Sequence, residues 1–370
     1  MSPTLELNTV DELSTGSLEP VSAADVVSWI DLSTTASTTV STTTALADVV
    51  VAATAAARAS HRILIGVGWP GAGVADELLD ALTVTVHDDP AGAHDRRTVL
   101  AAHLYTDLDT DLDTALARMA ASIAATPMAA AVTSQLLRAT RSLPVHEALI
   151  AESFAYSTLQ AGPEYARWLA AANYRPTAEH GEPVQLRRDG DRLVITLNRP
   201  HRHNALDAAM RDGLVDALTV ATMDATITDV LLCGNGASFS SGGDLAEFGT
   251  ASDPATAHLI RTQHRPGEQI HALATRLGDR CTASVHGAVM GGGLELAAFA
   301  ARVVAAPDSK FLLPELSMGL LPGAGGTVSV PRRIGRWRAA SMILGGNIID
   351  ATTALDWGLV DSVEPNNRRI

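Results

Sequence analysis

The sequence has few of the residues that mark an extracellular, metal-binding or membrane protein. Its 370 residues include only two cysteines, Cys233 and Cys281, with no CxxC spacing and no cysteine–histidine cluster typical of zinc. No stretch of roughly 18 uncharged apolar residues predicts a membrane span. The acidic N-terminus, MSPTLELNTVDEL, lacks the apolar stretch of a signal peptide. We therefore expect two reduced core thiols, no metal centre, no membrane partner and a cytoplasmic location.

Basic residues are also scarce. Lysine and arginine together number 27 against 41 acidic residues, and the formal net charge of −14 argues against a general nucleic-acid binder. Apolar residues make up 46 % of the chain and charged residues 18 %, a balance typical of a globular protein rather than a disordered one. The length allows one long domain or two domains. A polyanionic ligand would need a local basic patch.

The first hundred residues predict alternating strands and helices. Residues 33–59 are rich in Ala, Thr, Ser and Val, with a turn-like composition to about Thr44 and a helical one after it. Residues 62–68 (RILIGVG) and 82–87 (LTVTVH) predict buried strands, and residues 72–82 (AGVADELLDAL) predict a helix between them.

Residues 107–172 are strongly helical in pattern. The segments ALARMAASIAA, MAAAVTSQLLRAT and VHEALIAESFAYSTLQ predict three amphipathic helices, and Ser142 followed by Pro144 is a good start for the third. The polar residues 175–183, with two prolines and a glycine, predict a linker.

The pattern changes after Val184. The segment VQLRRDGDRLVITLNRP predicts a β-hairpin that turns at Asp189 and Gly190. A helix, the strand DVLLCG and a series of glycine-rich loops follow, with a strand and a helix for each loop. This alternation predicts the α/β class.

Residues 237–248 and 286–304 each contain a glycine-rich loop that is a candidate for binding or catalysis. Residues 241–244 (SGGD) follow a strand, and residues 291–293 (GGG) lead directly into a helix. Glycine lets the backbone approach a ligand, and a helix N-terminus presents unpaired N–H groups. Two such N–H groups converging on one oxygen would form an oxyanion hole.

Two glutamates accompany these loops. Glu295 lies in the first turn of the helix after the glycine triplet, and Glu315 lies in the glycine-rich segment 311–335. Two carboxyl groups near an oxyanion hole suit general acid/base chemistry beside an activated carbonyl. Taken alone, a glycine triplet is more often a packing device and an early helical Glu a surface residue. The order and spacing of the motifs together favour a site.

Five segments resemble, in order, the signature blocks of the crotonase (enoyl-CoA hydratase/isomerase) family. They are residues 195–206, 239–245, 285–297, 314–327 and 350–365. The resemblance covers about residues 184–365. It implies a crotonase-like spiral of ββα units, an acyl-CoA thioester as substrate, no cofactor beyond that CoA, and a homotrimer or hexamer.

The resemblance also implies roles for individual residues. The N–H groups of Gly243 and Gly292 match the oxyanion hole, and Glu295 and Glu315 match the two catalytic glutamates of the hydratases. In that reaction the glutamates hold a water that attacks the β-carbon, and Glu315 supplies the α-carbon proton. The implied substrate- and CoA-binding residues are Arg199, His201, Arg202, Ala205, Ser241, Gly242, Asp244, Leu245, Gly291, Pro322 and Gly323.

The chain order departs from the family pattern. Crotonases continue for some fifty residues beyond a segment like GLVDSVEP, whereas this sequence ends at Ile370. Residues 108–169 resemble that tail, placed before the core. We therefore expect a degenerate crotonase-like half-domain at 1–105, a helical segment of lid and trimerisation type at 106–178, and a catalytic core at 184–365. An unrelated helical domain fused in front is the alternative.

Three other functions remain open. The first is a cofactor-independent dioxygenase or thioester hydrolase that uses the same hole, although both glutamates favour hydration. The second is an acyl-CoA-binding or assembly subunit without catalysis. The third is a dinucleotide site, because residues 66–71 (GVGWPG) fit GxGxxG and Asp88 lies about twenty residues further on. Trp69 and Pro70 are awkward in a tight phosphate-binding turn, and a single βαβ unit is too little for such a domain.

Overall fold

The computed structural model describes residues 5–16, 18, 25–33, 43–71, 76–105, 110–172 and 181–365. The chain forms two compact units, and each is described by itself below. Unit 1 comprises Met1–Arg141 and Ile334–Ile348, and unit 2 comprises Ser142–Arg333 and Ile349–Ile370. Most of the predicted linker, residues 175–183, lies outside the described residues.

Unit 1 contains a five-stranded parallel sheet in the order β1-β2-β3-β4-β5. The strands are β1 (Leu7–Thr9), β2 (Val27–Asp31), β3 (Ile63–Val67), β4 (Val84–His87) and β5 (Thr98–Leu100). The predicted strands at 62–68 and 82–87 are confirmed. Spatial order follows chain order among these strands, so the sheet has no switch point of the kind that binds dinucleotides.

Helices cover both faces of this sheet. Strand β3 is buried along its whole length, because Leu64 packs toward the apolar cluster of α2 while Ile63 and Ile65 point to the other face. The first helices along the chain are α1 (Val10–Ser14), α2 (Thr43–Ala59) and α3 (Asp76–Ala81). After them come the 3-10 turns η3 (Pro90–Gly92) and η4 (Ala101–His103). A second group of helices contacts β3, β4 or β5: α4 (Leu112–Ala125), α5 (Pro127–Ala139) and α13 (Arg336–Gly345).

Helix α13 shows that the units are not contiguous in sequence. Ala339, Met342 and Ile343 on this helix are fully buried or nearly so, and α13 packs against α4, α5, β4 and β5 of unit 1. The chain therefore leaves unit 2 after α12 (Gly326–Ile334), adds a helix to unit 1 and returns.

Unit 2 is built on two sheets. The larger sheet has the order β14-β11-β9-β8-β7-β6, and only β6 and β7 pair antiparallel. The smaller sheet has the order β10-β12-β13. The strands are β6 (Val184–Asp189), β7 (Arg192–Leu197), β8 (Asp229–Gly234), β9 (Cys281–Val285), β10 (Ala288–Met290), β11 (Arg302–Ala305), β12 (Lys310–Leu312), β13 (Ile349–Asp350) and β14 (Ser362–Val363).

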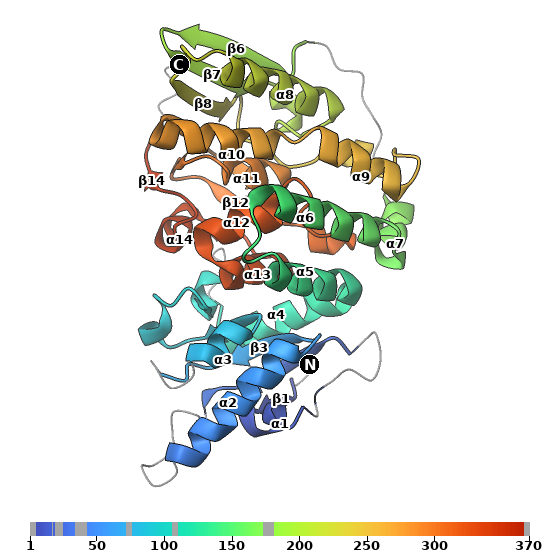
Figure 1. Ribbon diagram of the computed structural model, residues 1–370, viewed down its shortest axis with the longest axis vertical. Helices are drawn as coiled ribbons and strands as arrows, with labels where there is room; N and C mark the ends of the chain where they lie inside the picture. Colours follow the sequence, from blue (N-terminus) through green and yellow to red (C-terminus); the bar gives the residue numbers. More distant parts are fainter. Residues whose placement is uncertain are drawn as a thin grey trace. The chain divides into compact units, whose positions relative to one another are not determined.

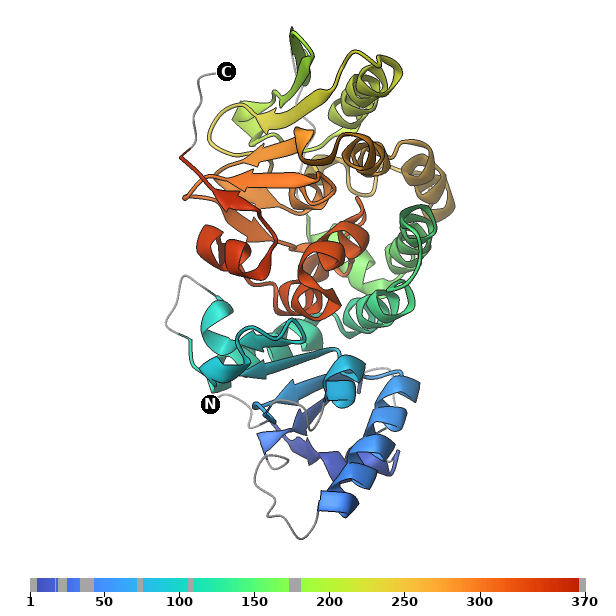
Figure 2. The same ribbon diagram turned by 60° about the vertical axis from the view of Figure 1, so that its left-hand side comes forward.

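Successive strands alternate between the two sheets. β9 lies in the larger sheet and β10 in the smaller one, and α11 (Gly292–Ala297) follows; β11 and β12 repeat this step before η8 (Glu315–Met318) and α12. After β8 the chain takes the same step toward the smaller sheet, where an isolated β-bridge pairs Ser240 with Val289 of β10. This is a spiral of ββα units, so the predicted crotonase-like α/β fold class is confirmed. Figure 2 shows the two sheets with their helices outside.

The remaining helices of unit 2 surround the sheets. They are α6 (Val145–Gln160), α7 (Pro163–Ala171), α8 (Ala208–Met223), α9 (Pro254–Gln263), α10 (Pro266–Leu277) and α14 (Ala351–Trp357), with 3-10 turns η5 (Pro200–Arg202), η6 (Leu245–Glu247) and η7 (Gly278–Arg280). Helix α6 packs against α9 (Figure 1), and α7 packs against η8. Residues 145–171, which precede the core in sequence, therefore belong to the same unit as the core.

Local sequence patterns predicted most of these elements. The hairpin turn at Asp189 and Gly190 is confirmed by the pairing of Asp189 with Arg192. The three helices expected in residues 107–172 are present, but α7 is separated from α6 by a break at Gly162 that the pattern did not show. The cap of α6 is Pro144 rather than Ser142. The boundaries at 105, 178 and 184 stay predictions.

No single helix among the described residues is long and apolar enough to cross a bilayer. Helices α4 and α5 reach the required length and composition only together, across a bend of 105°.

Gly287 offers a test of how β9 and β10 are joined. A Cβ there would lie 2.1 Å from Ala237 O, and its φ is +56°. We expect Gly287→Ala to lower the free energy of unfolding by about 3 kcal/mol or more, combining overpacking with left-handed strain. Gly190→Ala is the matched control, because its φ is +62° and no described atom lies within 4 Å of its Cβ. It should cost only about 1–2 kcal/mol. Urea unfolding measures both values. Equal losses in the free energy of unfolding for the two variants would contradict the close contact of Gly287 with Ala237.

Candidate active site

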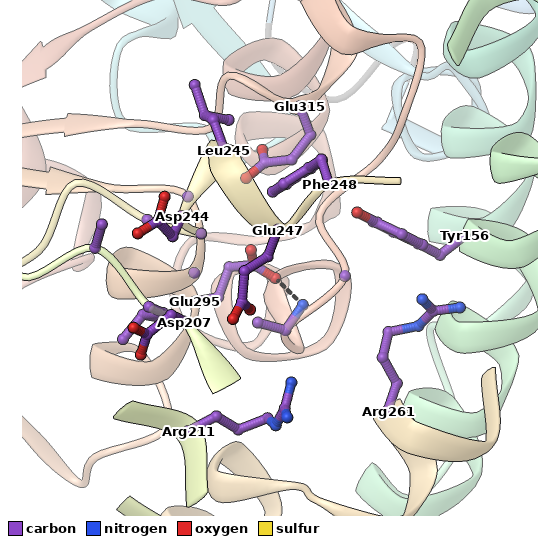
Figure 3. A pocket seen from close by; sticks show the side chains of 18 of the residues that line it. Tyr156, Asp207, Arg211, Asp244, Leu245, Glu247, Phe248, Arg261, Glu295 and Glu315 are labelled. Atoms are coloured by element: carbon purple, nitrogen blue, oxygen red, sulfur yellow. Dashed lines mark hydrogen bonds between the residues drawn. The ribbon is translucent and has the colours of Figure 1, made fainter. Parts of the chain in front are cut away.

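A cavity of about 940 Å³ lies within unit 2. Its wall includes the glycine loops around Gly243 and Gly292, the two glutamates, and side chains of α6, α8 and α9. Figure 3 shows Glu295, Glu315 and Glu247 near its centre, with Tyr156 and Arg261 on the side formed by α6 and α9. The structure therefore brings together motifs that are far apart in sequence.

Two backbone segments approach each other closely at this cavity. A Cβ on Gly242 would lie 2.9 Å from Met290 O and 3.4 Å from Gly292 N, and a Cβ on Gly293 would lie 2.6 Å from Ser240 Cβ. A Cβ on Gly292 would lie 3.8 Å from Gly243 N. Only glycine permits this approach, and it places the amides of Gly243 and Gly292 side by side.

The amides of Gly243 and Gly292 have no acceptor among the described residues. The amides just before them are engaged: Gly242 N–H donates to Ser240 Oγ at 3.2 Å, and Gly291 N–H donates to Leu312 O at 2.9 Å. Gly292 is also the first residue of α11, where N–H groups have no intrahelical partner. Two available donors therefore stand next to each other at the cavity wall.

Buried polar groups fix the first of these segments. Asn204 donates from Nδ2 to Asn235 O and Ser238 O at 2.9 Å and to Phe239 O at 3.1 Å. Asp244 caps η6 by accepting from Ala246 N–H at 3.1 Å. These bonds hold the loop on both sides of Gly243.

Arg199 supports the loop from inside. It is 3 % exposed, its guanidinium lies 3.0 Å from Asp244 and 3.2 Å from Asp207, and it donates to Ala205 O. It does not line the cavity. Its side chain is buried and donates toward Asp244, Asp207 and the loop, and its predicted contact with CoA stays a prediction.

Glu295 comes from the first turn of α11 and is 2 % exposed. Its Oε2 accepts from the N–H groups of Ala324 and Gly326, each at 2.7 Å. Burial raises its pKa to about 7, and these two hydrogen bonds oppose the rise. One oxygen is thus held by the backbone, and the residue lines the cavity.

Glu315 begins η8 and lies against the second glycine segment. Its Oε1 would be 2.7 Å from a Cβ on Gly291, the residue directly before Gly292. Its Oε2 is buried without a hydrogen-bond partner among the described residues. Burial, and then the charge of Glu295, raise its pKa well above the usual value.

A third buried carboxyl group, Glu152, was missed by the sequence analysis. It projects from α6, is 2 % exposed, and accepts from Gly325 N–H at 2.8 Å on Oε1. Its Oε2 accepts from Thr327 N–H at 2.9 Å and Thr327 Oγ1 at 2.6 Å. Burial and the charge of Glu295 raise its pKa to about 8. No local signal distinguishes this Glu from others on a helix.

The hydrogen bonds divide the roles that these three groups can take. Glu152 and Glu295 receive backbone N–H groups, which favour a charged carboxylate. Glu315 receives none from another described residue, and a nearby carboxylate disfavours its ionisation. The arrangement therefore favours ionisation of Glu295 over ionisation of Glu315.

Cationic side chains also line the cavity. His201 and Arg202, predicted from sequence, are joined by Arg211, Arg261 and Arg265, which were not. Arg261 lies over the Tyr156 ring, 4.4 Å from its centroid. The same wall also carries acidic side chains, among them Asp207, Glu247 and Glu268.

Most of the predicted site residues meet at this cavity. Those that line it are His201, Arg202, Ala205, Ser241, Gly242, Gly243, Asp244, Leu245, Gly291, Gly292, Glu295, Glu315 and Gly323. Arg199 and Pro322 do not line it. Within the described ranges, no group of three or more His, Cys, Asp or Glu side chains is arranged to hold a metal ion. The roles of the lining residues stay predictions.

Comparisons with known proteins agree with the motifs. Residues 190–369 match the model of the enoyl-CoA hydratase/isomerase family. The chain is 37 % identical over 175 residues to 2,3-dehydroadipyl-CoA hydratase of Escherichia coli, covering 47 % of this chain and 66 % of that protein. It is 34 % identical over 186 residues to a probable enoyl-CoA hydratase of Mycobacterium bovis, covering 50 % and 69 %.

Solved structures give a similar result. The enoyl-CoA hydratase of Thermoplasma volcanium is 33 % identical, and the match covers 50 % of this chain and 73 % of that chain with a TM-score of 0.44. The match spans 66 % of the Escherichia coli relative and 63 % of a probable enoyl-CoA hydratase of Bacillus subtilis. The chain thus spans somewhat less than two thirds of the length of these two curated relatives.

The three buried carboxyl groups predict a pH dependence of stability. Each has a raised pKa in the folded state, so the folded protein keeps protons that the unfolded chain loses above about pH 4.5. The contribution of these three groups to stability should be greatest below that pH and fall toward about pH 8, by on the order of 1.4 kcal/mol for each pKa unit.

Urea unfolding from about pH 5 to about pH 8 measures this slope. Glu315→Gln should flatten it, because the amide does not titrate. Glu147→Gln is the matched control, an exposed glutamate on α6. A slope that Glu315→Gln leaves unchanged would contradict the prediction.

Proposed function

Because the chain belongs to the enoyl-CoA hydratase/isomerase family, we propose that it binds an acyl-CoA thioester and adds water to a 2-enoyl-CoA. One observation carries the proposal most: two adjacent amides without protein acceptors lie beside two buried carboxyl groups with contrasting hydrogen bonds. Acyl transfer and isomerisation need the two amides that bind the thioester oxygen. Hydration also needs a charged base and a protonated acid at the same time. The different hydrogen bonding of the two carboxyl groups favours one in each state.

The amides of Gly243 and Gly292 act as the oxyanion hole in this proposal. The thioester oxygen accepts both N–H groups, and its partial negative charge grows as the enolate forms. Preorganised donors in a site shielded from water stabilise that charge without reorganising, and one such donor is typically worth about 3–4 kcal/mol. The position of Gly292 at the N-terminus of α11 adds the favourable end of the local peptide dipoles.

The two glutamates divide the proton transfers. Glu295, held by two backbone N–H groups, takes a proton from water while the water oxygen bonds to the β-carbon. Glu315 gives its proton to the α-carbon as the enolate collapses to the saturated thioester. The pair then resets by exchanging the proton gained for the proton lost.

The cationic side chains support the choice of a CoA ester. His201 and Arg202 lie on the loop that the family places at CoA, and both line the cavity. They would attract the phosphates of CoA, which the overall charge of −14 would otherwise repel. No cofactor apart from this CoA is part of the proposal. A cytoplasmic location and a homotrimer or hexamer also stay proposals.

Loss of the enoyl-thioester absorbance of crotonyl-CoA tests the reaction directly. We expect the wild-type protein to remove it and the hydrated thioester to accumulate. If the absorbance persists while CoA esters still raise the melting temperature, the chain binds acyl-CoA without this activity. Oxygen uptake with an arylacetyl-CoA would instead support the dioxygenase alternative.

Glu315→Gln tests the proton donor. We expect kcat for hydration to fall by about 10²–10⁴-fold, because the amide cannot deliver a proton, while the Kd of a saturated acyl-CoA stays close to that of the wild type. Glu147→Gln on the exposed face of α6 is the control for a neutralised glutamate. Equal kcat in the variant and wild type would remove Glu315 from the role.

A further inference from the structure

The loop that follows Glu315 is held by two carboxylates in alternation. Glu295 accepts the N–H groups of Ala324 and Gly326, and Glu152 accepts those of Gly325 and Thr327. All four bonds measure 2.7–2.9 Å. Four consecutive amides are thus shared between a residue of α11 and a residue of α6.

The packing around this loop leaves little room for it to move. A Cβ on Gly326 would lie 2.6 Å from Glu295 Cγ. A Cβ on Gly325, whose φ is +110°, would lie 2.4 Å from Phe299 Cε2, and one on Gly323 would lie 2.4 Å from Tyr156 Cδ2. The loop therefore lies directly on the side chains that flank it, and its position fixes where the Glu295 carboxylate is held.

We propose that Glu152 is a positioning residue for the hydration reaction: it holds the Gly325 and Thr327 amides so that the Ala324 and Gly326 amides orient the Glu295 carboxylate toward water. This inference rests on the proposed function. Glu152 acts through the loop and not on the substrate. A misplacement of about 1 Å in a reacting group can cost about 10²-fold in rate, so a loosened loop should slow the reaction.

A consequence concerns the helix that carries Glu152. Helix α6 precedes the core in sequence but lies in the same unit, and α7 continues along η8, where Tyr165 N would be 2.6 Å from a Cβ on Gly319. Trp168 of α7 also packs against Phe248, edge to face at 5.7 Å. The α6–α7 segment of the same chain thus completes the site. The residues after 184 do not form the whole site alone.

Glu152→Gln is the principal test. A glutamine keeps the shape but offers one acceptor oxygen, so either Gly325 or Thr327 faces an NH₂ group instead. We expect kcat to fall about 10–100-fold while KM changes little, because the cationic groups proposed for CoA are not altered. Glu152→Asp restores both acceptor oxygens and should recover part of kcat. Glu147→Gln, on the exposed face of the same helix, should leave kcat unchanged.

Amide hydrogen exchange gives a second readout that needs no turnover. Glu152→Gln should speed exchange at Gly325 and Thr327 more than at Ala324 and Gly326, and Glu295→Gln should give the opposite order. If wild-type protein hydrates no enoyl-CoA but this alternation is seen, the proposed function fails and the shared loop stands. Uniform exchange across the four amides overturns the loop assignment.

Thr327→Val covers the case in which Glu152→Gln does not fold. Valine removes one of the three donors to Glu152, the hydroxyl at 2.6 Å, and keeps both backbone bonds. We expect a fall in kcat of a few-fold with unchanged KM. These outcomes apply if the wild-type protein is active on crotonyl-CoA. A wild-type kcat in Glu152→Gln then overturns the positioning role. If Glu152→Gln is unfolded, a wild-type kcat in Thr327→Val overturns it instead. A loss confined to KM overturns it as well.

Discussion

The site depends on a close approach of two stretches of backbone that only glycine permits. Gly242 and Gly293 lie where a Cβ would meet Met290 O or Ser240 within 3 Å. The approach follows from the spiral of ββα units, because the bridge between Ser240 and Val289 brings the end of one unit to the start of the next. Gly243 and Gly292 line the cavity, and their amides have no acceptor among the described residues. Every role proposed for the glutamates assumes a carbonyl held at that position.

Burial then determines how the acidic groups behave. Removing Glu152, Glu295 and Glu315 from water raises all three pKa values, and the charge of Glu295 raises those of Glu152 and Glu315 further. Backbone N–H groups of other residues counteract this for Glu152 and Glu295, whereas Glu315 receives only its own backbone N–H. A set of chemically identical side chains thus becomes an ordered series in which one group is suited to donate a proton and another to accept one.

Sequence patterns predicted the local parts of this arrangement. The glycine loops, the Asp189–Gly190 hairpin and the two core glutamates could be found because turns, strands and short motifs depend on neighbouring residues. Glu152 could not, because its partner Gly325 lies 173 positions away and only the packing of α6 brings them together. The ion pairs of Arg199 were missed for a similar reason: a basic residue beside a ligand loop gives no sign that the partly buried Asp207 and the buried Asp244 will pair with it. The placement of α13 in unit 1 likewise depends on which surface buries Met342 and Ile343.

The carbonyl stretching frequency of a bound thioester tests the hole most directly. The Glu315→Gln variant should hold an enoyl-CoA without turning it over, and an isotope label on the thioester carbonyl would identify its band in infrared or Raman difference spectra. We predict a lower frequency than in water, because two N–H donors draw electron density onto the oxygen. A band at or above the frequency in water would show that the Gly243 and Gly292 amides do not meet the carbonyl.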